Sequence, residues 1–144
     1  QYFQHSAAAL STEAILAILT CILVSFALLH LVKNNRASAH VILFMLFAIQ
    51  VINAFYHIFF SFYFSDFSPG AITAALLYLP VNFLIAQAAF REGYLKSYFE
   101  YGCIAFLGTT TFVLFEIIGP LIIGLAIIFS LMYYFYFNKR LSNN

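Results

Sequence analysis

Five long apolar runs, separated by short segments that carry most of the charges, make up almost the whole chain. A helix rises 1.5 Å per residue and a bilayer core is about 30 Å thick, so about 20 apolar residues cross it. Each run is close to this length. The pattern therefore predicts an all-α integral membrane protein, a bundle of five transmembrane helices at about 12–32, 40–63, 71–90, 98–116 and 120–137.

The division of the last stretch, 98–137, depends on its middle. As one helix it would be about 60 Å long, twice the thickness of the membrane core. Glu116 and the pair Gly119-Pro120 interrupt it, and Pro either breaks a helix interior or opens a helix at its first turn. We expect two spans joined by a tight hairpin. The alternative is four spans plus a kinked or re-entrant segment around Gly119-Pro120.

The charges change sign from one gap between runs to the next. Lys and Arg dominate the gaps after the first, third and fifth runs, whereas acidic residues mark the second and fourth; in chain order these residues are Lys33, Arg36, Asp66, Arg91, Lys96, Glu116, Lys139 and Arg140. Short loops rich in Lys and Arg stay on the cytoplasmic side. The alternation predicts a multi-pass protein of an inner or plasma membrane, with its N-terminus out and its C-terminus in.

The organisation that follows is a single membrane domain with short ends. We expect residues 1–11 to form an extracytoplasmic tail, 12–137 the helical bundle and 138–144 a cytoplasmic tail. The start, Gln1-Tyr2-Phe3-Gln4, resembles the end of a cleavable purification tag. Residues 1–10 are therefore left out of the fold argument.

Composition supports the same class. Charged residues make up 8% and apolar residues 65% of the chain, whereas soluble domains carry about 25% charged residues. There is no basic patch that would neutralise nucleic-acid phosphates, which argues against a nucleic-acid partner. The lipid bilayer is the first expected partner.

Polar residues at membrane depth are the best functional pointers, because they are costly in hydrocarbon unless they have partners. The second run carries Gln50, Asn53, His57 and Ser61 at steps of three, four and four residues. These steps place them on one face of a helix. This stripe is the strongest polar constellation in the chain.

The third run offers a matching face of small residues around Asn82, at the depth of Gln50 and Asn53; its other members are Ala71, Ala74, Ala75, Tyr78, Ala86 and Ala89. Small residues allow membrane helices to approach closely. One interpretation is that the amides only hydrogen-bond between helices. The other is a polar cavity among the second, third and fourth helices, lined by Gln50, Asn53, His57, Tyr78, Asn82 and Glu116.

Two acidic residues have expected partners. His57 and Glu116 both project from the outer half of the bundle, where a His–Glu pair would titrate near neutral pH and act as a proton-coupled gate. The alternative is that each lies in the headgroup zone and contacts water. Glu100 is expected to pair with Lys96 or Arg91 near the inner boundary.

The sequence contains no recognisable catalytic or cofactor-binding motif. No pair of His residues shares a depth well inside the membrane, as two axial haem ligands would, and no His or Cys spacing matches a zinc site. No Ser or Cys has a base at helical reach. The sequence predicts no enzyme activity, no catalytic residue, no metal and no cofactor.

We therefore expect a transporter or channel-like unit that binds or passes a small polar or cationic solute through the polar face of helices two to four, and that acts as an oligomer. The alternatives are a non-catalytic structural subunit of a larger membrane complex, or the membrane sensing domain of a receptor. Expected partners are a second copy of the chain or other membrane subunits, and a small polar ligand.

Overall fold

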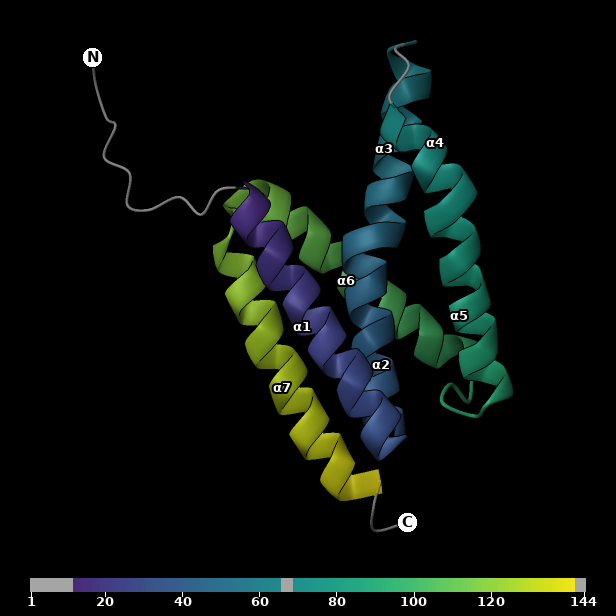
Figure 1. Ribbon diagram of the computed structural model, residues 1–144, viewed down its shortest axis with the longest axis vertical. Coiled ribbons are helices and arrows are strands. Elements are labelled where there is room, and N and C mark those ends of the chain that lie inside the picture. Colours follow the sequence, from purple (N-terminus) through teal and green to yellow (C-terminus); the bar gives the residue numbers. More distant parts are fainter. Residues whose placement is uncertain (1–11, 66–68, 142–144) are drawn as a thin grey trace, which may run out of the picture.

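The computed structural model describes residues 12–65 and 69–141, and this part of the chain is almost entirely helical, without a strand (Figure 1). The predicted tail 1–11, Asp66 and residues 142–144 lie outside the described residues. The elements are α1 (Thr12–Lys33), α2 (Arg36–Leu46), η1 (Phe47–Val51), α3 (Ile52–Tyr63), α4 (Pro69–Thr73), η2 (Ala74–Tyr78), α5 (Leu79–Arg91), α6 (Tyr98–Ile118) and α7 (Leu121–Leu141).

Five helical stretches are long and apolar enough to cross a membrane, which confirms the five predicted helices. The second begins at Arg36 rather than at residue 40. The side chain of Asn35 caps this helix by accepting a hydrogen bond from the Ser38 N–H at 2.9 Å, and such a cap satisfies a backbone donor that the first turn leaves without a partner. The last helix continues to Leu141 instead of 137.

The chain reverses direction at Gly119-Pro120, as the hairpin interpretation predicted. Gly119 has φ 91°, a conformation that glycine adopts without the steric cost of a Cβ. Its N–H donates to the Phe115 carbonyl at 2.8 Å and closes the end of α6. From this turn α6 and α7 diverge towards their other ends (Figure 1).

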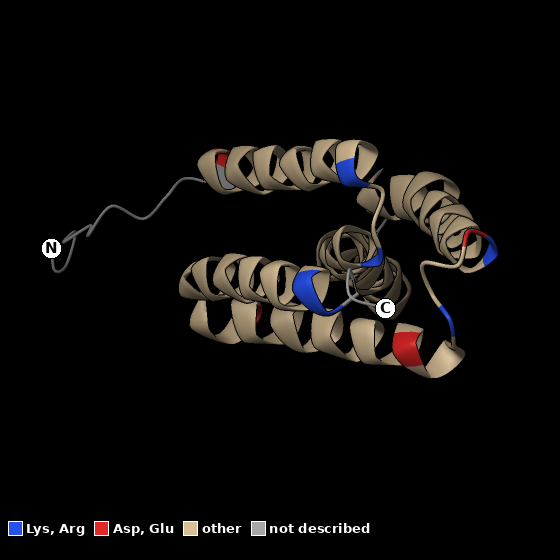
Figure 2. Cartoon of the chain, turned by 90° about the horizontal axis from the view of Figure 1, so that it is seen from below, with Lys and Arg blue, Asp and Glu red and all other residues tan. Residues whose placement is uncertain are grey.

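One continuous helix, α2–η1–α3, lies at the centre of the bundle. α1 and α7 pack on α2, α6 packs on α2 and η1, and the η2–α5 helix packs along its other side. Viewed from below, the central helix is seen end-on, with α1 on one side and α6 and α7 on the other (Figure 2). Most of the buried apolar side chains belong to it, among them Val41, Leu43, Phe44, Met45, Leu46 and Val51.

The central helix and its neighbour each contain one π-helical turn, and these turns contact each other. Such turns are rare, carry one extra residue and are frequent at functional sites. In η1 the turn includes Gln50, and η2 ends just before Pro80.

The outer surface of the bundle is apolar over most of its area. Phe62 and Phe99 are each 82% exposed, and Leu76 is 75% exposed. Large contiguous apolar surfaces are unusual on soluble monomers and suit contact with lipid or other proteins. Length, composition and surface thus agree in favouring a multi-pass membrane protein.

At Gly108, α6 closely approaches the central helix. A Cβ placed there would lie 3.1 Å from both the backbone nitrogen of Ala48 and the Cβ of Phe47. A Cβ at Gly102, on the same helix, would meet nothing within 4 Å. The close approach of α6 to η1 therefore requires glycine at position 108 but not at position 102.

We predict that Gly108→Ala destabilises the protein by about 1–3 kcal/mol, the usual cost of overpacking. Gly102→Ala is the matched control and should not lower stability, since Ala favours the helix more than Gly does. Thermal unfolding in detergent measures both. Equal midpoints for the two variants would show that α6 does not pack on η1 in this way.

Candidate functional site

All Lys and Arg residues of the chain lie near one end of the bundle, which we call the basic end. This end contains the α1–α2 connection, the α5–α6 connection and the end of α7 (Figures 1 and 2). Glu13 and Glu116 lie near the opposite end, which we call the far end.

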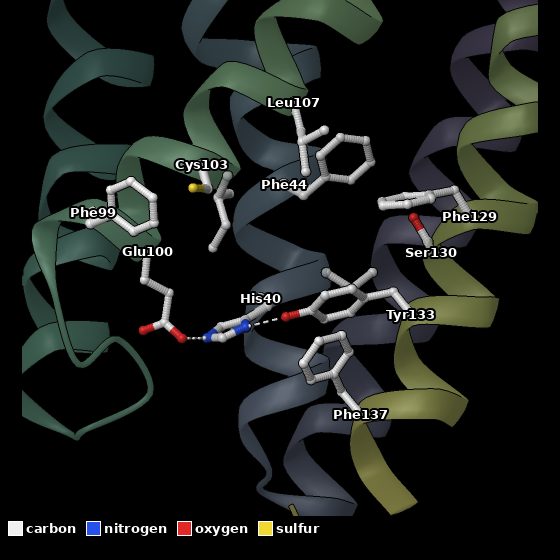
Figure 3. A pocket seen from close by; sticks show the side chains of 12 residues that line it. His40, Phe44, Phe99, Glu100, Cys103, Leu107, Phe129, Ser130, Tyr133 and Phe137 are labelled. Carbon is white, nitrogen blue, oxygen red and sulfur yellow. Dashed lines mark hydrogen bonds and ion pairs between the residues drawn. The ribbon is translucent and has the colours of Figure 1, made fainter. Parts of the chain in front are cut away.

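A cluster of polar side chains joins three helices at the basic end. Nη2 of Arg36 on α2 contacts Oε1 of Glu100 on α6 at 2.5 Å, and Nε2 of His40 lies 3.4 Å from the same oxygen. The hydroxyl of Tyr133 on α7 lies 2.6 Å from Nδ1 of His40. Figure 3 shows the side chains of Glu100, His40 and Tyr133 in line across the cavity.

The hydrogen bonds of His40 define its tautomer. Nε2 lies 2.8 Å from the carbonyl oxygen of Tyr94, and a carbonyl oxygen only accepts, so Nε2 carries hydrogen. In the neutral ring Nδ1 is then the acceptor, and the hydroxyl of Tyr133 donates to it. The His40 side chain is only 6% exposed, so these contacts fix its orientation.

Local sequence signals place Glu100 in this cluster. Ser97 caps α6 by accepting from the Glu100 N–H at 3.1 Å, and Oε2 of Glu100 accepts from the Lys96 N–H at 2.8 Å. The run Ser97-x-x-Glu100 thus forms a variant of the capping box. The expectation that Glu100 pairs with the side chain of Lys96 or Arg91 is wrong: its ionic partner is Arg36, brought close by the packing of α6 on α2.

Two cavities follow the groove between the central helix, α6 and α7. The basic-end cavity has a volume of about 300 Å³ and is lined by His40, Val41, Phe44, Phe99, Glu100, Cys103, Ile104, Leu107, Phe129, Ser130, Tyr133 and Phe137. Its walls are mainly aromatic and aliphatic, and its polar groups are concentrated towards the basic end (Figure 3).

The far-end cavity has a volume of about 380 Å³ and also reaches α1. Its polar lining consists of Asn53, Thr111, Glu116 and Ser130, and the remaining lining residues are apolar. The two cavities share Phe44 and Ser130. We call these two shared lining residues the partition.

Ser130 is the polar group of this partition. It is 1% exposed, and its hydroxyl has no hydrogen-bond partner among the described residues. A buried hydroxyl without a partner costs about 1–3 kcal/mol. The position is therefore suited to a water molecule or a polar group of a ligand.

The structure separates the six predicted site residues into three groups. The Asn82 amide donates at 2.8 Å to both the Gln50 side chain and the Tyr78 carbonyl. Asn53 and Glu116 line the far-end cavity. His57 contacts the ring of Tyr56, and no ion pair joins it to Glu116 among the described residues.

Of the predicted amide contacts, the one between Gln50 and Asn82 is present as an interhelical hydrogen bond. A separate cavity between helices two and three is lined by none of the six predicted residues, and the two cavities of the groove lie elsewhere. They lie between helices two, four and five of the predicted bundle, on the side of the central helix that faces α6 and α7. Sequence reasoning missed Arg36, His40, Ser130 and Tyr133. The spacing of Arg36 and His40, four residues apart, was an available signal that they share a face.

The family of proteins of unknown function with an HXXEE motif matches residues 1–85. The chain belongs to this family. The match extends from the start of the chain into α5 and so includes Arg36 and His40 but not Glu100 or Tyr133. Neither the curated proteins nor the solved structures gave a match.

The motif that gives the HXXEE family its name does not occur in these 144 residues. No two Glu residues are adjacent, and none of the four His residues is followed by Glu at its third and fourth positions. The family name therefore indicates no functional residue in this chain.

We predict that Gln50 and Asn82 are energetically coupled. In a double-mutant cycle with Gln50→Leu and Asn82→Leu, the coupling free energy should be about 0.6 kcal/mol, and at most about 1.7, as for other hydrogen bonds between membrane helices. The coupling free energy is obtained from the free energies of unfolding of the wild type and the three variants in mixed micelles. A cycle of Gln50→Leu with Asn53→Leu is the control, and a coupling no larger than in that control would contradict the assigned bond.

Proposed function

We propose that the chain is an integral membrane transport unit that carries a small cationic solute along the groove between the central helix, α6 and α7. The observation that supports this most strongly is the pair of neighbouring cavities, one towards each end, whose linings share Phe44 and Ser130. A carrier needs a binding space reached from each side and a partition that can move, and two neighbouring cavities with shared lining residues are compatible with this requirement.

The proposed orientation places the basic end in the cytoplasm. All six Lys and Arg residues are near this end, and short loops rich in Lys and Arg remain cytoplasmic. The N-terminus is then outside and the C-terminus inside, in an inner or plasma membrane. The basic-end cavity would admit solute from the cytoplasm, and the far-end cavity would release it outside.

The lining of the groove favours a cation with apolar substituents. Each cavity contains one carboxylate, Glu116 or Glu100. Arg36 neutralises Glu100, whereas Glu116 is exposed and has no ion pair among the described residues. Aromatic faces attract organic cations, and the basic-end cavity presents Phe44, Phe99, Phe129, Tyr133 and Phe137.

Assembly into an oligomer is part of the proposal. The arm formed by α3, α4 and α5 lies away from α1 and α7 (Figure 1). Aromatic side chains are exposed along α3 of this arm, including Phe55, Phe59, Phe62 and Tyr63. A second copy or another membrane subunit packing here would cover an aromatic surface suited to protein contact.

We predict that the purified protein in proteoliposomes takes up radiolabelled tetraethylammonium down its concentration gradient, with valinomycin and K⁺ to compensate charge. Glu116→Gln should slow uptake about tenfold, the factor that corresponds to about 1.4 kcal/mol of lost cation binding. Glu13→Gln is the matched control, because Glu13 is near the same end but does not line the cavity.

Uptake no faster than in protein-free vesicles would contradict the proposal. Equal uptake by the two Glu variants would show that the cation does not pass through the far-end cavity.

A further inference from the structure

We infer that His40 carries a proton in exchange for the cation, so that solute movement is coupled to proton movement in the opposite direction. This inference rests on the proposed function. It is supported by the contacts from Tyr133 through His40 to Glu100 at the basic end, and by the buried hydroxyl of Ser130, which lines the same cavity and has no partner among the described residues.

The proposed proton path begins at Ser130, at its end away from Glu100. Ser130 and Tyr133 are three residues apart on α7 and therefore lie on one face of this helix. Both line the basic-end cavity, and the hydroxyl of Ser130 has no partner among the described residues. A water molecule bound to this hydroxyl would hold a proton donor or acceptor one helical turn from Tyr133.

The transfer at His40 is balanced in protons. A proton reaches the Tyr133 oxygen from water as Tyr133 gives its own hydrogen to Nδ1 of His40, which becomes an imidazolium. Nε2 then gives its proton to Glu100, whose Oε1 is 3.4 Å away. Glu100, with its side chain 26% exposed, releases the proton to solvent at the basic end.

The ring then returns to its first tautomer. After transfer Nδ1 carries the hydrogen, and the bare Nε2 faces the Tyr94 carbonyl oxygen, formerly 2.8 Å from it. Two acceptors at this distance repel each other, so rotation of the ring or exchange with water restores Nε2–H. The protein gains and loses no proton over the cycle.

The charges around His40 explain why proton and cation exclude each other. Glu100 on α6 stabilises the imidazolium, Arg36 on α2 opposes it, and Tyr133 on α7 and the Tyr94 carbonyl contribute neutral dipoles. A cation in the same cavity would repel the imidazolium. Cation entry therefore favours loss of the proton, which is the basis of exchange.

The test uses proteoliposomes that contain the pH dye pyranine, with tetraethylammonium added outside and valinomycin and K⁺ present. In the wild-type protein, cation entry should raise the internal pH. Tyr133→Phe keeps the ring but removes the hydroxyl, and it should lower the number of protons moved per tetraethylammonium at least about tenfold.

Tyr134→Phe is the matched control. Tyr134 is the next residue, is buried against Phe26 and donates no hydrogen bond among the described residues, so its variant should exchange protons as the wild type does. His40→Gln should uncouple like Tyr133→Phe, and the thermal midpoint of each variant verifies folding.

The outcomes separate the two proposals. Cation uptake without any change of internal pH in the wild type would overturn proton exchange and leave the transport function standing. A normal proton ratio in Tyr133→Phe would overturn the role of this relay. Absence of both fluxes would overturn the transport function itself, and the exchange with it.

Discussion

The packing of the other long helices on a single continuous helix, α2–η1–α3, is the constraint on which the rest of the structure depends. α6 approaches it closely at Gly108, against Phe47 and Ala48. On the opposite side, the bond from Asn82 to Gln50 joins the π turn of the central helix to the η2–α5 helix. The central helix is therefore held on both faces, and the groove forms only where neighbouring helices separate.

That separation begins at Gly119-Pro120. α6 and α7 share this short turn and then diverge, so the two helices lie farther apart towards the basic end (Figure 1). At the basic end, polar contacts join the central helix to both α6 and α7: Arg36 and His40 contact Glu100 on α6, and His40 contacts Tyr133 on α7. Asn35 also donates to Asn138 at 2.9 Å. The groove is thus limited by a covalent turn at one end and by a hydrogen-bonded cluster at the other.

Much of the fold could be predicted from the sequence, because the lengths of the apolar runs and the break at Gly119-Pro120 are local signals. The equal depth of Asn82 with Gln50 and Asn53 on two adjacent helices indicated an amide contact, and the structure places it at Gln50. The partner of Glu100 could not be found in this way, since Arg36 is 64 residues away and reaches it only through the packing of α6 on α2. The cavities depend on the divergence of α6 and α7, which no local pattern specifies.

The π turns were equally beyond the sequence pattern. The period of polar residues from Gln50 to His57 fits an ordinary helix, and the extra residue in η1 changes which of them point together. This helps to explain why Gln50 and Asn53 serve different sites: Gln50 faces Asn82, whereas Asn53 lines the far-end cavity.

The central claim is that the groove holds water and cations rather than lipid, and the reactivity of Cys103 tests it most directly. Cys103 lines the basic-end cavity and is exposed, whereas Cys21 lies on α1 outside it. In a Cys21→Ser background in membranes, Cys103 should react with a trimethylammonium-ethyl methanethiosulfonate about tenfold faster than with the sulfonate analogue, after correction for their rates with a free thiol. Failure of both reagents to react until the membrane is dissolved would show that lipid fills the groove, and would contradict the account.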